Sequence, residues 1–298
     1  MVKIVECIPN ISEGRRLDVV EEILAEVRRV AGVTLLDYSS NADHNRTVIS
    51  LIGEAERVLE AVWKLIVKAS KTIDLNQHQG EHPRMGATDV VPFVPIRGMS
   101  MEECVDLAKA LGERVGRELA IPVFLYEKAA TRPERRNLAE VRRGQYEGLK
   151  ESIMTPERTP DYGPSVLGKA GAIAIGARPP LVAFNVNLGT TNIEIGKAIA
   201  TGIRGSSGGF VNVKALAIDL SEQGLVQISM NMVDTQGTPL YRALEFIKTE
   251  AAHFGVPIIG SEIVGLVPMD AMMEVATYYL GLHDFTSEQI LEKRVFGF

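Results

Sequence analysis

Cysteine is scarce in this sequence, which has only Cys7 and Cys104 among its 298 residues. The two lie far apart, and neither belongs to a CxxC pair. This scarcity excludes a disulfide-stapled scaffold and a cysteine-rich zinc site. Cys7 falls in an apolar, strand-like run and Cys104 in a helical pattern. Both are therefore predicted to be small core residues of a reduced, intracellular protein.

A long apolar run is missing as well. No stretch approaches the length that is needed to cross a membrane. The N-terminus begins with a strand-like segment, without the basic leader and apolar region of a secretory signal. We therefore expect a cytoplasmic protein that has no membrane partner.

The sequence also has no excess of positive charge. Its 32 Lys and Arg are outnumbered by 38 Asp and Glu, which gives a formal net charge of −6. Nucleic-acid-binding proteins usually carry a basic face, so no nucleic-acid partner is expected. The densest group of basic residues is interpreted as a solvated helix face and consists of Arg132, Arg135, Arg136, Arg142 and Arg143.

What the sequence does have is the material of a globular α/β protein. Hydrophobic residues make up 46% of the 298 residues, and this length predicts about two domains. Both halves show the same order of predicted elements, namely strand, helix, two strands, helix and strand. The segments are 3–8, 19–30, 33–36, 47–52, 54–72 and 89–96 in the first half, and 181–186, 193–203, 213–220, 225–232, 238–254 and 258–266 in the second. A capping box at residues 100–103 begins a further helix.

This order is typical of ferredoxin-like units. The predicted fold class is α/β (α+β), with two ferredoxin-like βαββαβ sandwiches packed with a ligand groove between them. The domain boundary is placed near residues 176–180, because the pair Pro179-Pro180 cannot continue a helix. The predicted domains are residues 1–178 and 179–298. The proline-rich segment 154–164 before the boundary is typical of a functional loop or a linker.

Residues 77–89, QHQGEHPRMGATD, are the most informative stretch of the chain. They bring two imidazoles, two carboxylates and a guanidinium together with two glycines and a proline, which fix unusual backbone geometry. Histidine has an unperturbed pKa near neutrality and can exchange protons at working pH. Such a cluster in a constrained loop before a buried strand indicates a functional site more often than a plain turn.

The same loop contains the zinc-binding pattern H-x-x-E-H, in residues 78–82. That pattern needs a helix, so that residues four apart share one face. Gly80 weakens a helix here, and Pro83 pushes His82 into extended backbone. We therefore expect no metal at this loop.

Three further segments were considered as sites. Residues 205–209, GSSGG, lack the Gly-Lys-Ser/Thr ending of a phosphate loop and precede a predicted strand, so a mobile surface loop is expected. The turn at residues 43–46 is either a polar hairpin tip or a second part of the site beside His82. His253 and His283, near helix ends, are interpreted as structural.

Several motifs together resemble the glutamate formiminotransferase family. They are residues 80–87 followed by Asp89, residues 7–14 (CIPNISEG), residues 45–47 (NRT) and residues 183–188 (AFNVNL). The resemblance spans nearly the whole chain. It implies a stand-alone transferase that lacks the cyclodeaminase domain of the mammalian enzyme.

The resemblance also implies an activity and a set of site residues. The activity is transfer of a formimino group between tetrahydrofolate, as co-substrate, and a glutamate derivative, by a homodimer without a metal. His82 matches the catalytic histidine of the family. Segments 163–171 and 214–223 match the folate-binding segments, and the turn at 43–46 resembles the bacterial form of its hairpin. The residues expected to bind substrate or folate are Glu81, Arg84, Asp43, His44, Arg46, Gly163, Pro164, Lys169, Lys214 and Asp219.

The reaction suits these side chains on chemical grounds. An amine must lose a proton as it attacks a trigonal carbon, and the departing nitrogen must gain one, so an imidazole of near-neutral pKa at His82 could serve both steps. Glu81 or Asp43 could orient the ring, and Arg84 or Arg46 could hold a substrate carboxylate bidentately. Two alternatives stay open at this point. They are transfer of a formyl group from 5-formyltetrahydrofolate, and a folate-binding protein with little turnover.

Overall fold

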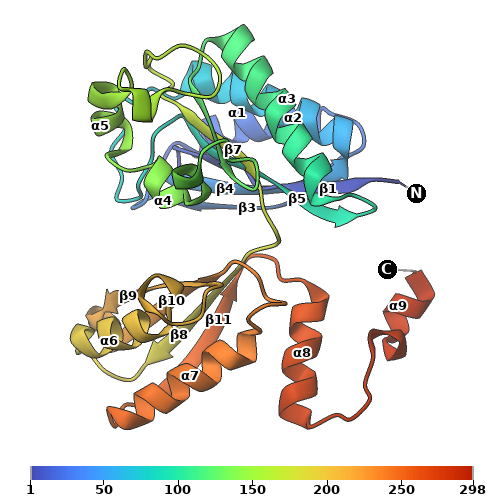
Figure 1. Cartoon of the computed structure of the whole chain (residues 1–298), viewed down its shortest axis with the longest axis vertical. Coiled ribbons are helices and arrows are strands. Elements are labelled where there is room, and N and C mark those ends of the chain that lie inside the picture. Colours follow the sequence, from blue (N-terminus) through green and yellow to red (C-terminus); the bar gives the residue numbers. More distant parts are fainter. Residues whose placement is uncertain (1, 297–298) are drawn as a thin grey trace. The chain divides into compact units, whose positions relative to one another are not determined.

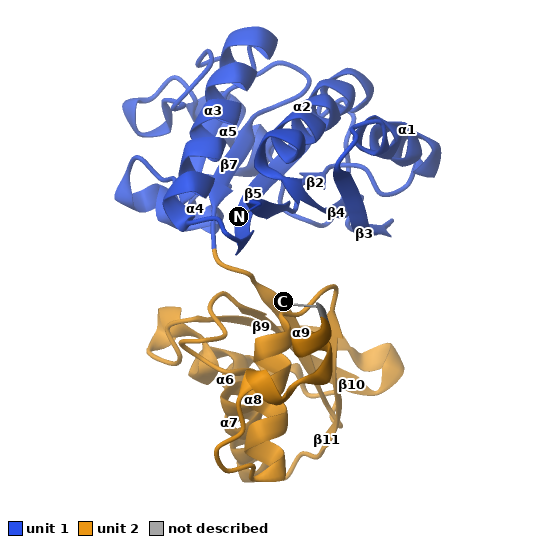
Figure 2. Cartoon of the chain, turned by 90° about the vertical axis from the view of Figure 1, so that its right-hand side faces the viewer, with its two compact units in different colours: residues 1–178 blue, residues 179–298 orange. Residues whose placement is uncertain are grey.

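The computed structural model describes residues 2–296 of the chain (Figure 1). The chain divides into two compact units, residues 1–178 and 179–298, which are coloured separately in Figure 2. Each unit has its own sheet and its own hydrophobic core. The predicted mixed α/β class is confirmed, whereas the ferredoxin-like classification of the two sheets stays a prediction.

The first unit is built on a mixed sheet of seven strands. They are β1 (Ile4–Cys7), β2 (Asn10–Ile11), β3 (Val33–Asn41), β4 (Arg46–Glu54), β5 (Thr88–Arg97), β6 (Val123–Glu127) and β7 (Ile173–Ala177). Both β1 and β2 pair with β4 on one side and with β5 on the other, so they act as one interrupted strand. β5, β7 and β6 then extend the sheet in parallel pairing.

β6 and β7 were not predicted from the sequence. Almost every residue of both strands is buried, so neither shows the alternation of a half-exposed strand. Strands of a parallel sheet that are covered on both faces have this continuous apolar pattern, which periodicity alone cannot assign. The βαββαβ order predicted for the first half therefore omits one edge of its sheet.

Helices cover both faces of this sheet. The helices are α1 (Leu17–Arg28), α2 (Ala55–Thr72), α3 (Met101–Leu119), α4 (Leu138–Val141) and α5 (Gln145–Ser152), with the 3-10 turns η1 (Pro133–Arg136) and η2 (Pro156–Arg158). The first three lie on one side in Figure 1, where they enclose the main core with the inner sheet residues. Val141 and Leu149, from α4 and α5, pack with Val90 and Tyr126 in a smaller core. The second face therefore lies under α4 and α5.

The helix signals of the first half are confirmed. The Ser100 hydroxyl accepts a hydrogen bond from the Glu103 backbone N–H at 3.2 Å, and the Glu103 carboxylate accepts one from the Ser100 N–H at 2.8 Å, as in a capping box. Cys7 and Cys104 are buried and unpaired, as expected of core residues. None of the helices within residues 2–296 is long and apolar enough to cross a membrane.

The second unit has a four-stranded antiparallel sheet in the order β11-β8-β10-β9. Its elements are β8 (Val182–Leu188), α6 (Ile193–Ile203), η3 (Gly205–Ser207), β9 (Val213–Leu220), η4 (Ser221–Gln223), β10 (Leu225–Met232), α7 (Leu240–His253), β11 (Ile258–Val264), α8 (Met269–Leu280), η5 (Ser287–Gln289) and α9 (Leu291–Phe296). The strand–helix–strand–strand–helix–strand order is as predicted. Residues 205–209 contain the 3-10 turn η3 and precede the strand β9, so they do not begin the helix that a phosphate loop needs.

Candidate active site

The histidine loop joins the end of α2 to the start of β5 and has no regular secondary structure over residues 78–85. His78 and His82 therefore do not share a helix face, as Gly80 and Pro83 predicted. Among residues 2–296, no cluster of three or more His, Cys, Asp and Glu side chains is placed to hold a metal ion.

The loop is tied to the hairpin turn between β3 and β4. The Glu81 N–H donates to the Asp43 carbonyl oxygen at 3.2 Å, and the Asn45 side-chain amide donates to the Gln79 carbonyl oxygen at 2.9 Å. The rings of His44 and His82 lie 5.9 Å apart between centroids. The turn therefore lies beside the His82 loop, and its part in substrate binding stays a prediction.

Gly80 allows this close approach. A Cβ atom added there would lie 2.3 Å from the His44 carbonyl oxygen and 2.9 Å from Asn45 Cβ. We expect Gly80→Ala to push the loop away from the hairpin and to lower turnover at least 10-fold, because misplacement by about 1 Å can cost a factor on the order of 10². Steady-state kinetics on the folded variant measures this. Gly148→Ala is the matched control, since a Cβ at Gly148 meets nothing within 4 Å; equal kinetics for both variants would contradict the prediction.

His78 has a structural part in the loop. Its Nε2 lies 2.9 Å from the Asn45 carbonyl oxygen, and its Nδ1 accepts from Arg84 Nε at 3.1 Å. These partners assign the Nε2–H tautomer and leave no ring nitrogen for a substrate. Burial, followed by the positive charge of Arg84, lowers the pKa of this ring, while the hydrogen bond to Asn45 opposes the shift. His78 is therefore a neutral link between the hairpin and Arg84.

Arg84 does not fit the role that its sequence position suggested. It is buried, and its five N–H groups are directed at protein acceptors: Nε at His78 Nδ1, Nη1 at Gln145 and Glu147, and Nη2 at Glu147 and the His78 carbonyl. The two carboxylate contacts, at 2.8 and 2.6 Å, form a bidentate pair with Glu147 of α5. No N–H group remains for a substrate carboxylate, so the prediction is corrected. Arg84 fixes the loop to α5.

A shallow hollow opens where the loop, the hairpin turn and the start of β5 meet. The lining residues are Ser12, His44, Asn45, Arg46, His78, His82, Arg84 and Asp89. His82 is half-buried there, neither in a dry interior nor on a convex exterior. The hollow thus brings together four residues of the predicted site, which are His82, His44, Arg46 and Arg84.

The charge state of His82 differs from the expectation of a near-neutral pKa. Burial, together with the positive charges of Arg46 and Arg142, lowers the pKa of the ring to about 3. The ring is therefore neutral at pH 7 and a weak base in the ligand-free protein. His82 needs an added negative charge nearby before it can accept a proton readily.

This shift predicts how folding stability depends on pH. An unfolded histidine binds a proton below about pH 6.5, but the folded His82 ring does not until about pH 3. Between these values the unfolded state holds more protons than the folded state. The stability that the neutral His82 ring contributes is therefore present above about pH 6.5 and is lost as the pH falls toward 3. We expect the free energy of unfolding of the wild type to fall more between pH 7 and pH 5 than that of His82→Ala. Denaturant titrations at the two pH values measure this, and equal losses would contradict it.

Arg46 and Arg142 are the basic groups that act on His82. Arg46, at the start of β4, donates through Nη2 to Asn10, and burial together with Arg142 lowers its pKa to about 10. Arg142 follows α4 and is ion-paired through Nη2 with Asp89, whose other oxygen accepts from the Met85 N–H at 2.8 Å. Arg142 was interpreted as part of a solvated helix face. That interpretation is wrong for Arg142, and also for Arg135, which is only 4% exposed.

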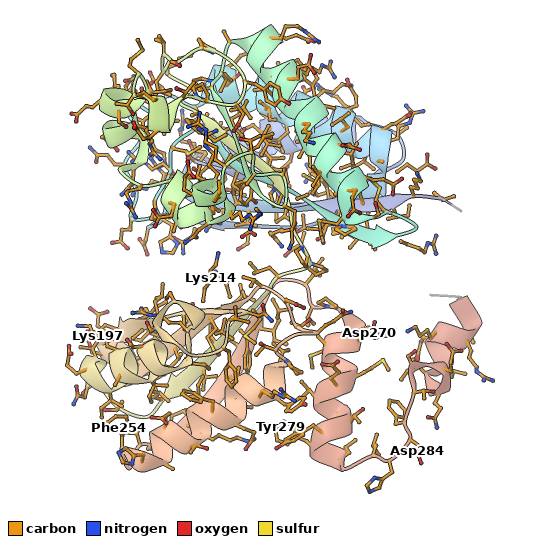
Figure 3. The ribbon with its side chains drawn as sticks, viewed as in Figure 1. Lys197, Lys214, Phe254, Asp270, Tyr279 and Asp284 are labelled. Carbon is orange, nitrogen blue, oxygen red and sulfur yellow. The ribbon has the colours of Figure 1, made fainter. Side chains whose placement is uncertain are left out.

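The other predicted site residues lie outside this hollow or face solvent. Glu81 and Asp43 are exposed, and within residues 2–296 neither carboxylate bonds to the His82 ring. Gly163, Pro164 and Lys169 are in the first unit but do not line the hollow, and Gly163 takes a φ of +81°. Lys214 and Asp219 are in β9 of the second unit, where Figure 3 labels Lys214. Their folate-binding role stays a prediction.

Sequence reasoning missed several residues of the site. Ser12 and Asn45 had a signal, because both lie in motifs that were quoted for the family. The Ser12 hydroxyl donates to the Gly86 carbonyl at 2.8 Å, and the Asn45 carboxamide oxygen accepts from the Gly14 N–H at 3.0 Å. Arg142 and Glu147 had no signal. Their helices are short, and their partners Asp89 and Arg84 are 53 and 63 residues away in the chain.

A half-buried imidazole near guanidinium groups, on a loop fixed by glycine and proline, is typical of the active site of an enzyme. Two family models match the chain. Formiminotransferase domain, N-terminal subdomain, matches residues 4–178, and Formiminotransferase domain matches residues 183–294. The chain belongs to the formiminotransferase family.

Curated relatives agree with the family models. The chain is 52% identical to a glutamate formimidoyltransferase of Streptococcus pyogenes, with all of both chains covered. It is 50% identical to one of Thermoplasma acidophilum, which covers 99% of this chain and 98% of the relative. A mouse formimidoyltransferase-cyclodeaminase is 41% identical over 94% of this chain and 53% of its own length. The family suggested by the sequence motifs is therefore confirmed.

Proposed function

We propose that the chain transfers a formimidoyl group between N-formimidoyl-glutamate and tetrahydrofolate, with His82 as general base and general acid. The observation that carries this is the position of the His82 ring, half-buried in a hollow with Arg46 and beside His44. Full-length similarity to two glutamate formimidoyltransferases supports the reaction class.

The proposed steps use one proton carrier. A secondary amine of the reduced folate attacks the formimidoyl carbon, and His82 accepts the proton that this nitrogen loses as the C–N bond forms. In the tetrahedral adduct, His82 returns the proton to the glutamate nitrogen as its C–N bond breaks. The ring ends neutral, as it began, so the same side chain serves both directions. Exposed Glu81 and Asp43, together with His44, are proposed to contact the substrates at the rim of the hollow.

Folate is proposed to enter as a co-substrate and to contact Gly163, Pro164 and Lys169 in the first unit and Lys214 and Asp219 in the second. These residues lie in the segments that resemble the folate-binding segments of the family. Residues 1–178 are proposed as the catalytic subdomain, because the hollow lies there, and residues 179–298 as the second subdomain. A cytoplasmic homodimer that acts without a metal is proposed on the same resemblance.

The experiment is a spectrophotometric assay with the purified protein. It compares 5-formimidoyl- and 5-formyltetrahydrofolate as donors, each with and without glutamate. Glutamate-dependent consumption of the formimidoyl donor supports the proposal. Faster use of the formyl donor would favour the formyltransferase instead, and folate binding without turnover of either donor would favour a folate-binding protein.

A further inference from the structure

The hollow contains more positive charge than its own residues balance. Arg46 from β4 and Arg142 from the end of α4 reach His82 from different elements, and each disfavours a proton on that ring. The two guanidinium groups also act on each other, since Arg142 lowers the pKa of Arg46. Asp89 is the carboxylate that offsets them, through an ion pair with Arg142. One negative charge therefore faces two positive ones.

The hydrogen bonds of the two arginines are also incomplete. The buried Nε atoms of Arg46 and Arg142 have no acceptor among the described residues, and each guanidinium makes one side-chain hydrogen bond, to Asn10 and to Asp89. Arg84, in the same hollow, has all five N–H groups paired. Buried guanidinium donors are normally paired, so Arg46 and Arg142, unlike Arg84, keep unused hydrogen-bonding capacity for an anion.

We propose that Arg46 and Arg142 together bind the α-carboxylate of the amino-acid substrate beside His82. This deepens the proposed function and rests on it. A planar guanidinium fork matches a carboxylate in geometry and charge. In an α-amino acid the nitrogen is attached to the carbon that carries this carboxylate. A carboxylate held at the arginines therefore places the nitrogen that exchanges the formimidoyl group next to the imidazole.

The same contact activates the histidine. His44 from the hairpin turn, Arg46 from β4 and Arg142 from the α4 segment oppose the protonation of His82. The other titratable or charged groups that line the same hollow are His78, Arg84 and Asp89. A bound carboxylate adds a negative charge among them, so it raises the basicity of the ring at the moment when a proton must be accepted. His82 is thus a stronger base with the amino acid bound than without it.

The test compares L-glutamate with 4-aminobutyrate, which is glutamate without the α-carboxylate. Binding is measured by calorimetry and by imidazole NMR signals of His82, and turnover by the folate assay.

We expect wild type to bind glutamate at least 10-fold tighter than 4-aminobutyrate, and Arg142→Gln to lose most of this preference. The variant should raise the KM for glutamate about 10- to 100-fold, as expected for lost charge-assisted hydrogen bonds, and leave the KM for folate unchanged. Arg143→Gln, whose side chain is 74% exposed, is the matched control.

The pKa of His82 supplies a second measurement. Saturating glutamate should raise it in the wild type and in Arg143→Gln but not in Arg142→Gln. Should Arg142→Gln fail to fold, the variants Arg46→Lys and Arg142→Lys replace it in the comparison of glutamate with 4-aminobutyrate. They retain the positive charge but lose the planar guanidinium group that pairs with a carboxylate. A rise in the KM for folate alone would assign the arginines to a carboxylate of the folate tail and overturn the proposal, as would unchanged glutamate binding. Lost glutamate binding in a protein that lacks turnover would refute the proposed function while supporting the carboxylate site.

Discussion

His82→Ala is expected to lower turnover by about 10²- to 10⁴-fold, the usual contribution of a positioned general acid–base group. The variant keeps the hollow and its arginines, so both substrates should still bind. The loss should therefore fall on kcat, with little change in either KM. Steady-state rates in both directions of the reaction measure it.

Two comparisons separate the loss of the proton carrier from general damage. His253→Ala, at the exposed end of α7, removes an imidazole outside the first unit and should leave turnover unchanged. Added imidazole should restore part of the rate in His82→Ala, because the deleted ring leaves a space beside the substrates. Turnover within a factor of three of the wild type in His82→Ala would remove this residue from the mechanism.

The secondary structure of the second unit was largely predictable because its sheet is covered on one face. In β9, Val213 and Ala215 point into the core and alternate with exposed Lys214 and Leu216, which gives the pattern of a half-buried strand. In the first unit the same reasoning failed for β6 and β7, in which almost every residue is buried. Alternation of apolar and polar residues indicates a strand with one exposed face, and β6 and β7 have no exposed face.

Those features of the site that depend on neighbouring residues in the sequence were predictable. Gly80 and Pro83 indicated a non-helical loop. The turn at residues 43–46 had two open interpretations, a hairpin tip or a second part of the site, and the folded chain places it beside the loop. The charge state of His82 was not predictable, because it depends on Arg142, which only the folded chain brings there. Arg84 shows the same limit. The sequence neighbours of Arg84 suggest that it binds substrate, but in the folded chain its guanidinium group is ion-paired with Glu147 of α5.

A second large effect, on stability, is expected at the arginine cluster of residues 132–143. Arg135 and Asp161 form an ion pair in which the side chains are 4% and 9% exposed, with 2.5 Å between Nη1 and Oδ2. The same Asp161 oxygen accepts from the Leu125 N–H of β6 at 2.8 Å, and the Arg135 guanidinium lies 5.1 Å from the centre of the Phe124 ring. This pair therefore fixes the proline-rich segment to the edge strand of the sheet.

Asp161→Ala should destabilise the protein by about 3–5 kcal/mol, because it leaves the Arg135 cation buried without a counterion. For a unit of this size the melting temperature should fall by roughly 6–20 °C. Arg143→Ala, from the same cluster, breaks an ion pair at a 74% exposed side chain and should cost less than about 1 kcal/mol. Adding Arg135→Met to Asp161→Ala should recover part of the loss, since the unpaired charge is then gone. A loss below about 1 kcal/mol for Asp161→Ala would mean that water reaches Arg135, and the segment would then be held by its backbone contacts instead.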